Sequence, residues 1–189
     1  CPPLAQQSND KHNNGRTMAS QDRLKLLGRE SRDIVTLSGL VQDAIFVPAD
    51  MTIEDDKKRF VAILNRFQWE RAAAFDAQDA SVGEQDARFQ DDITSGYTRS
   101  FAALTVEGIT GARTKSIKMG TRDQFVSIMA LVPDENGLTL VCSGEAAIRL
   151  SGSNIRVFLE DLGEPWPTQL KPEHDDDLAA IASEAPEMS

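Results

Sequence analysis

The sequence predicts an α+β domain in which an antiparallel sheet is closed by a helix near the C-terminus. One observation is a strand pair: apolar residues alternate at 138–142 and again at 148–150, and residues 143–145 supply a tight turn between the two runs. A second observation is an apolar stripe at helical spacing, formed by Ile155, Phe158, Leu159 and Leu162. Gly163 and Pro165 follow as a stop signal that is typical of helix C-termini.

The N-terminal part of the domain predicts a short strand followed by a helix. Leu24 and Leu26 alternate with charged residues, which favours a strand. Ser31 has the hydroxyl of an N-cap, and Asp33 stands in the first turn, where a carboxylate stabilises the helix dipole. The apolar stripe consists of Ile34, Leu37, Val41, Ala44 and Ile45. We therefore expect one helix over 31–45.

Further strands are predicted between residues 51 and 137. The charged residues 54–58 predict a hairpin turn. The run 60–67 that follows is apolar on both faces, which is typical of a strand in the middle of a sheet with cover on each side. The other strand-like runs are 101–106, 109–117 with Gly108 and Gly111 as bulges, and 125–132. A hairpin loop is expected at 133–137, where Gly137 suits a positive φ.

The chain is expected to contain one domain, residues 21–172, between two polar flanks. Residues 1–20 are rich in Asn, Gln, Ser and Pro without an apolar period, and we expect them to be disordered. Residues 173–189 carry six acidic side chains and no Lys or Arg, so the same is expected of this acidic tail. Within the domain, residues 71–96 hold six acids and two arginines, and they predict a mobile acidic insertion with at most a helical turn.

Composition excludes several classes of function. The net charge of −10 over 189 residues argues against nucleic-acid binding, since phosphate contacts dominate that affinity. No apolar run approaches the roughly 18 residues of a membrane span. Two cysteines, Cys1 and Cys142, suit a reducing compartment and hence the cytoplasm. Met18 stands just before the first ordered-looking segment, and one interpretation is that it is the true start of the protein. The alternative is a processed lipoprotein of the cell envelope that is anchored through Cys1.

Catalytic machinery is not expected. Both histidines, His12 and His174, lie in the polar flanks, so no histidine in the domain can act as a general base. Cys142 falls inside a strand pattern and is interpreted as a core residue. The acidic residues around His174 lack a frame that would hold a metal ion. We predict no catalytic residue, no metal site and no cofactor, and an enzyme is the less favoured hypothesis.

Two sets of residues are candidates for partner or ligand binding. Arg66 and Trp69 stand at the exit of the strand 60–67, where they form a natural recognition pair. The alternative is that Trp69 packs on the rim of the sheet and Arg66 pairs with a nearby acid. Arg113 and Lys115 share one strand face within a basic run that continues to Lys118 and Arg122, and this patch would suit an acidic protein surface or an anionic metabolite. The alternative is an ordinary solvent face that balances acidic neighbours.

Several separated motifs resemble one protein family. They are Gln42-Asp43-Ala44, Lys58-Arg59-Phe60, Asn65-Arg66-Phe67-Gln68-Trp69-Glu70, Ile148-Arg149-Leu150, Asp161-Leu162-Gly163, Trp166 and Lys171-Pro172-Glu173-His174-Asp175. In this order they resemble domain-of-unknown-function family 2948, found mainly in alphaproteobacteria, over about Asp22 to Asp175. The resemblance implies a bacterial, cytoplasmic protein and implies no activity.

The order of strands ending in a helix is similar to a pleckstrin-homology-like barrel, in which a partly open barrel is capped by a C-terminal helix. The helix at 31–45 departs from that pattern and leaves a two-layer α+β sandwich as the alternative. The first functional hypothesis is a non-enzymatic binding or adaptor domain for a cytoplasmic protein partner. The second is a protein that binds an anionic small molecule, or an enzyme of unknown reaction, through a pocket that uses Arg66, Arg113 and carboxylates. The sequence leaves the partner's identity and the oligomeric state open.

Overall fold

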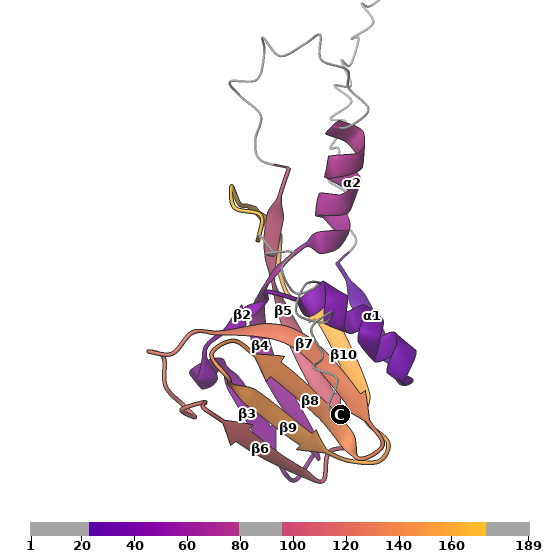
Figure 1. Cartoon of the computed structure of the whole chain (residues 1–189), viewed down its shortest axis with the longest axis vertical. Coiled ribbons are helices and arrows are strands. Elements are labelled where there is room, and N and C mark those ends of the chain that lie inside the picture. Colours follow the sequence, from indigo (N-terminus) through magenta and orange to yellow (C-terminus); the bar gives the residue numbers. More distant parts are fainter. Residues whose placement is uncertain (1–22, 80–95, 173–189) are drawn as a thin grey trace, which may run out of the picture.

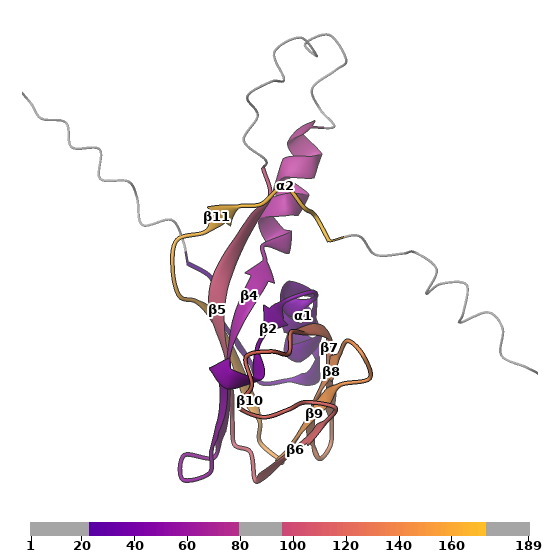
Figure 2. The same ribbon diagram turned by 90° about the vertical axis from the view of Figure 1, so that its left-hand side faces the viewer.

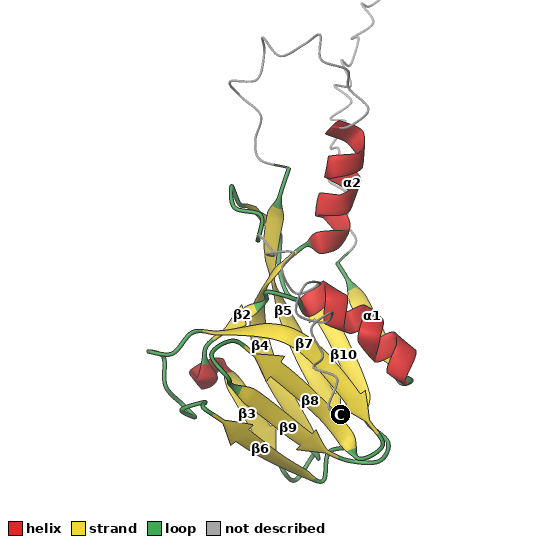
Figure 3. Ribbon diagram, in the orientation of Figure 1, coloured by secondary structure: helices red, strands yellow, loops and turns green. Residues whose placement is uncertain are grey.

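The computed structural model describes residues 23–79 and 96–172 (Figure 1). They form one antiparallel sheet that bends into two layers, together with two α-helices (Figure 3). Layer I consists of β1 (Lys25–Gly28), β10 (Arg156–Asp161), β5 (Thr98–Glu107) and β4 (Arg59–Phe67), with β3 (Met51–Glu54) on β4 and β11 (Trp166–Pro167) on β5. Layer II consists of β7 (Val126–Asp134), β8 (Gly137–Cys142), β9 (Ala147–Ser151) and β6 (Gly111–Lys115).

The two layers are joined by β2 (Ile45–Phe46), which pairs with β4 of layer I and β7 of layer II. A 3-10 turn, η1 (Pro48–Asp50), then leads into β3. Figure 2 shows the two layers from the side, and the buried apolar residues lie between them. Because successive side chains of a strand point to opposite faces of the sheet, one set in each layer points into this space and the other set points to solvent.

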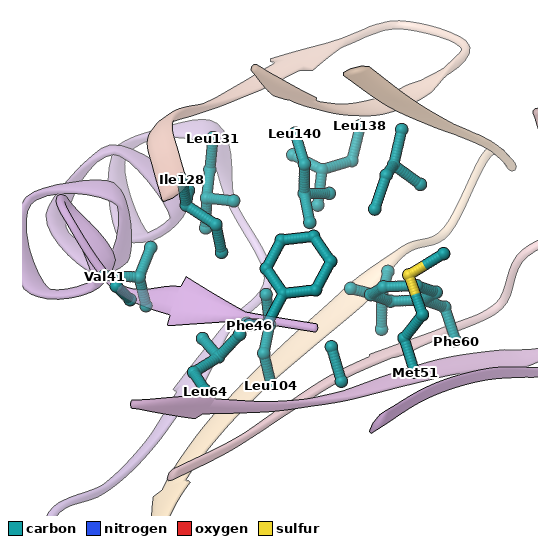
Figure 4. Close-up of a cluster of buried hydrophobic side chains, with 14 of the residues drawn as sticks. Val41, Phe46, Met51, Phe60, Leu64, Leu104, Ile128, Leu131, Leu138 and Leu140 are labelled. Atoms are coloured by element: carbon teal, nitrogen blue, oxygen red, sulfur yellow. The ribbon is translucent and has the colours of Figure 1, made fainter. Parts of the chain in front are cut away.

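The core lies between the layers (Figure 4). Phe60 and Leu104 of layer I meet Leu138 and Leu140 of layer II, and Phe46 on the connecting strand fills the space between them. The first helix, α1 (Ser31–Val41), packs against β7 and β1 and contributes Ile34, Leu37 and Val41 to the same core. Layer I and layer II therefore stabilise one another through a single hydrophobic interior.

The sequence predicted much of this arrangement. The first strand, the helix that follows it, the hairpin turn at 54–58, the strand 60–67 and the hairpin at 133–137 are confirmed. The N-cap of α1 is Glu30 rather than Ser31, and the Asp33 carboxylate accepts the Glu30 backbone N–H at 3.1 Å. The helix ends at Val41, so the last residues of the predicted span, Ala44 and Ile45, instead lead into β2.

The predicted C-terminal helix is wrong, because residues 156–161 form the strand β10 between β1 and β5. Val157, Leu159 and Asp161 are buried on one face, whereas Phe158 and Glu160 lie on the other. A period of two and a helical period share several positions in so short a run, so periodicity alone cannot separate them. The extended conformation of 156–161 is stabilised by its hydrogen-bonded pairing with β1 and β5.

The predicted barrel is not confirmed. Strands β1 and β6 are the two ends of the strand order, and among the described residues they do not pair with each other, so the sheet stays open. The α+β class holds, but both layers are formed by sheet, whereas the alternative sandwich would place helices against a sheet.

A second helix, α2 (Trp69–Asp79), occupies the first part of the predicted acidic insertion. It projects beyond the two layers at the ends of β4 and β5 (Figure 1). Its Ala72 is buried, and its Phe75 ring contacts Tyr97 in an edge-on arrangement at 5.5 Å. The rest of the predicted insertion, residues 80–95, lies outside the described residues, as do the predicted disordered flanks.

Candidate functional site

Arg66 lies at the centre of a buried polar cluster where β4 leads into α2. Its side chain is 0% exposed. The guanidinium donates two hydrogen bonds to the Asp161 carboxylate on β10, from Nε at 2.8 Å and from Nη2 at 2.9 Å. It donates two more to Glu70 in the first turn of α2, at 3.1 and 2.7 Å. This bidentate geometry on both sides engages all three nitrogens of the guanidinium and joins two strands and a helix.

Asp161 is held in its ionised form by this cluster. Burial alone would raise the pKa of Asp161, but Arg66 together with the hydrogen bonds from Ser100 and Leu24 outweighs that effect and leaves the pKa below its ordinary value. The Ser100 hydroxyl at 3.1 Å and the Leu24 backbone N–H at 3.4 Å add further hydrogen bonds. Burial would lower the pKa of Arg66, whereas Asp161 and Glu70 raise it above its ordinary value. Both partners therefore remain charged inside the fold.

Trp69 is half-buried next to this cluster. Its indole N–H donates to the backbone carbonyl of Gln42 at 2.9 Å, and its ring meets Phe67 edge-on at 4.6 Å. The structure thus agrees with the alternative that pairs Arg66 with acids and packs Trp69 on the rim of the sheet. Arg66 is enclosed, so in this structure its guanidinium is not available to a partner at the surface.

The surface beside the cluster has little room for a ligand. A depression lined by Arg23, Gln68, Arg71 and Asp161 has a cavity volume of about 10 Å³, enough for roughly one water molecule. Arg66 is enclosed within layer I, whereas Arg113 is exposed on the outside of layer II. The cluster therefore connects β4, β10 and α2 through hydrogen bonds and ion pairs.

The outer face of layer II brings together the other candidate residues. The strand register places one side chain from each strand in a row across this face: Val132, Thr139, Arg149 and Arg113. The neighbouring row is Ala130, Val141, Ala147 and Lys115. Side chains that are paired across strands lie on the same side of a sheet. Arg113 and Lys115 therefore share one face, as predicted from their spacing.

Positive charge gathers at the β6 edge of this face. Arg149 is neutralised locally, since it pairs with Asp134 and donates to the Thr139 hydroxyl at 3.1 Å; with the Asn136 backbone N–H, it lowers the pKa of Asp134 to about 2. Lys115 lies 3.7 Å from Glu145, and both side chains are well exposed. The exposed guanidinium of Arg113 makes no hydrogen bond or ion pair within the described part of the chain.

The middle of the same face is apolar and exposed. Val132 and Val141 are 46% and 38% exposed, and Met129 at the irregularity of β7 is 40% exposed. Ala130 and Ala147 between them are too small to cover these side chains. The basic residues can be predicted from the sequence, but this apolar part cannot, because the run 125–132 does not indicate which of its two faces lies inside.

The family of the chain follows from a comparison with family models. Residues 24–174 match the model described as "Protein of unknown function (DUF2948)". The chain belongs to this family. The match begins at β1 and extends past β11, so the DUF2948 domain comprises both layers and both helices, which confirms the resemblance seen in the separated motifs. No curated protein and no solved structure matches the chain.

Cys142 of this DUF2948 domain is a thiol in the interior. Cys142 is a free, buried cysteine on β8, and burial raises the pKa of its thiol to about 11. A thiol that stays protonated is a poor nucleophile, which agrees with the prediction of a core residue. Within residues 23–79 and 96–172, no three His, Cys, Asp or Glu side chains are grouped to hold a metal ion. No helix in those ranges has the length and apolar character needed to cross a bilayer.

Proposed function

We propose that this DUF2948 domain is a non-enzymatic binding domain that recognises another protein through the outer face of layer II. The observation that supports this most is the combination of exposed Val132 and Val141 with the exposed cations of Arg113 and Lys115 on one sheet face. An apolar centre with a charged rim is the usual composition of a protein interface.

The chemistry of this face selects for an acidic partner. Arg113 is exposed and has no hydrogen bond or ion pair among the described residues, and Lys115 beside it is exposed as well, so this edge attracts acidic groups. Such complementarity gives specificity and speeds association. The preferred partner has an apolar patch that is bordered by Asp or Glu side chains.

The proposal includes a cytoplasmic location. A single cysteine in the described residues, held as a free buried thiol, suits a reducing compartment. Arg66 and Trp69 then have a supporting role, because they fix the frame of layer I and α2 and do not themselves contact the partner.

Affinity capture with a matched set of variants tests the proposal. The tagged chain, the double variant Arg113→Glu/Lys115→Glu and the variant Val132→Lys are each incubated with a lysate of the source organism. For each of the two variants, we expect the amount of captured partner to be at least tenfold lower than for the wild type, because each variant removes a different half of the interface.

Two controls separate this effect from changes in net charge or polarity. Arg23→Glu/Arg32→Glu reverses two exposed cations outside layer II, and Val35→Lys replaces a valine of α1 that is 62% exposed. Both controls should retain the same proteins as the wild type. Equal retention by the layer II variants and the wild type would contradict the proposal.

A further inference from the structure

The outer face of layer I is the second large surface that the described residues leave uncovered. Strand β4 is apolar on both sides: Phe60, Ala62 and Leu64 are fully buried in the core, while Val61 and Ile63 point outward. Apolar residues on both faces are typical of strands that are covered on each side. Figure 2 shows layer II and α1 on the inner side, and no described segment packs across the outer side of β4.

Neighbouring strands extend this apolar surface. The register places Thr52, Val61, Thr105, Phe158 and Leu27 in one row across five strands, β3, β4, β5, β10 and β1. Further along the strands, Phe101 is 51% exposed and its ring contacts Trp166 at 4.9 Å. The row between Val61 and Phe101 consists of Ile63, Ala103, Glu160 and Lys25, and the exposed Lys25–Glu160 ion pair forms its end. The apolar part of the face is therefore centred on β4 and β5 and is bordered by charged pairs. An apolar surface that spans several strands marks an interaction site rather than scattered surface hydrophobics.

A row of alternating charges borders this surface at the N-terminal end of β4. Its members, in order from β3 to β10, are Glu54, Arg59, Glu107 and Arg156. Arg59 pairs with Glu54, and Arg156 Nη2 lies 2.8 Å from a Glu107 carboxylate oxygen. The row is neutral in sum, and each member keeps between 25% and 52% of its side chain exposed.

The order of signs makes this row complementary to itself. Rotation by 180° about an axis parallel to the strands, between β4 and β5, reverses the order from acid–base–acid–base to base–acid–base–acid. Glu54 of one copy then faces Arg156 of the other, and Arg59 faces Glu107, so every acid meets a base. Twofold symmetry with a self-complementary patch is the commonest arrangement in soluble oligomers.

We infer that two copies of this chain associate through the outer faces of layer I, with the apolar rows in contact and the charged rows reversed against each other. Five strands about 4.8 Å apart and about six residues long give a footprint of roughly 500 Å². Standard interfaces bury about 800 Å² of accessible surface per partner. Since a corrugated face has more accessible area than footprint, the dimer belongs to the weaker end of that class. It leaves the outer faces of layer II directed away from the interface, on opposite sides of the assembly.

Sedimentation of the purified full chain over a range of concentrations tests the dimer. The wild type should approach twice the mass of 20.7 kDa at high micromolar concentration and dissociate on dilution. An acidic variant, Arg59→Glu/Arg156→Glu, and a basic variant, Glu54→Lys/Glu107→Lys, should each be monomeric at every concentration. An equimolar mixture of the two should recover a dimer, because opposite charges again face each other.

Arg113→Glu/Lys115→Glu is the control with the same change in charge as the acidic variant. It should dimerise like the wild type, so that loss of partner capture and loss of the dimer are separate results. A wild type that stays monomeric to millimolar concentration would overturn the inference. A dimer that persists in the acidic variant and in the basic variant would overturn it as well.

Cross-linking covers the case in which a charge variant does not fold. Thr105 lies next to the proposed axis, so Thr105→Cys in a Cys1→Ser background should be joined to its counterpart by a short bismaleimide reagent. Thr36→Cys, an exposed position on α1, provides the control and should stay uncoupled. Equal yields at the two positions would contradict the proposed interface.

Discussion

Arg66 joins three elements at once, because its guanidinium contacts Asp161 on β10 and Glu70 on α2 while its backbone is part of β4. The sequence identified Arg66 as a residue of interest and offered pairing with an acid as one of two alternatives. It did not identify Asp161, which is 95 residues away along the chain. The two residues of this ion pair are brought together by strand pairing, and local sequence patterns do not reveal which distant strands pair.

Removing the Arg66 side chain should leave the Asp161 carboxylate buried without its main partner. For Arg66→Ala we therefore expect a loss of about 3–5 kcal/mol in the free energy of unfolding. The double variant Arg66→Met/Asp161→Leu removes both charges and should lose less than Arg66→Ala alone. Urea unfolding followed by circular dichroism measures both values. A loss below about 1 kcal/mol for Arg66→Ala would mean that the cluster contributes little.

The lowered pKa of Asp161 predicts a dependence of stability on acid. A carboxyl group whose pKa is lower in the folded state stabilises the fold fully above its unfolded pKa, near 3.8, and loses this contribution as the pH falls through the folded pKa. The wild type should therefore lose stability more steeply below about pH 4 than Asp161→Asn does. Asp55→Asn, in the exposed turn before β4, is the control and should follow the wild type. Parallel curves for Asp161→Asn and the wild type would contradict the assignment.

At the scale of elements, β10 and α2 show where local signals are insufficient. The apolar residues of 155–162 satisfy a helical period, but pairing with β1 and β5 makes 156–161 a strand. The Ala-rich start of α2 was expected to form at most one turn. Ala72 in the interior and Phe75 against Tyr97 extend the helix to Asp79, through tertiary contacts that its weakly apolar sequence does not reveal.

Two glycines provide a direct test of the elements that contain them. Gly39 is exposed in the helix α1 with open space where a Cβ would stand, so Gly39→Ala should raise the free energy of unfolding by about 0.5–1 kcal/mol. Gly137 at the β7–β8 turn has φ +152°, and a Cβ there would lie 2.1 Å from the Leu150 carbonyl oxygen. Gly137→Ala should therefore destabilise the domain. Thermal melts of both variants check the opposite signs, and a stable Gly137→Ala protein would contradict the described turn.

For the whole molecule, the sequence predicted the α+β class, most strands and the absence of a membrane-spanning run, but it did not predict how the sheet bends. The bend depends on the two-residue strand β2, which pairs with both β4 and β7 and is too short to give a periodic signal. The bend also decides which side of each strand is solvent-exposed. For that reason the basic residues of β6 were found from the sequence, while the apolar parts of both outer faces were not.

The two outer faces give the domain two separate surfaces on opposite sides of one core. If both proposals hold, a dimer through layer I presents two copies of the layer II face. A partner with two matching sites would then bind more tightly than a partner with one, because its second contact is intramolecular. The acidic variant Arg59→Glu/Arg156→Glu should abolish this gain and retain binding to a single site.

Recognition through the outer face of layer II can be tested by competition for captured proteins. Proteins from a lysate are first bound to immobilised wild-type chain, and untagged protein is then added in excess. Untagged wild type should release them, whereas untagged Arg113→Glu/Lys115→Glu, shown by its melting curve to be folded, should not. Equal release by the two proteins would contradict recognition through this face.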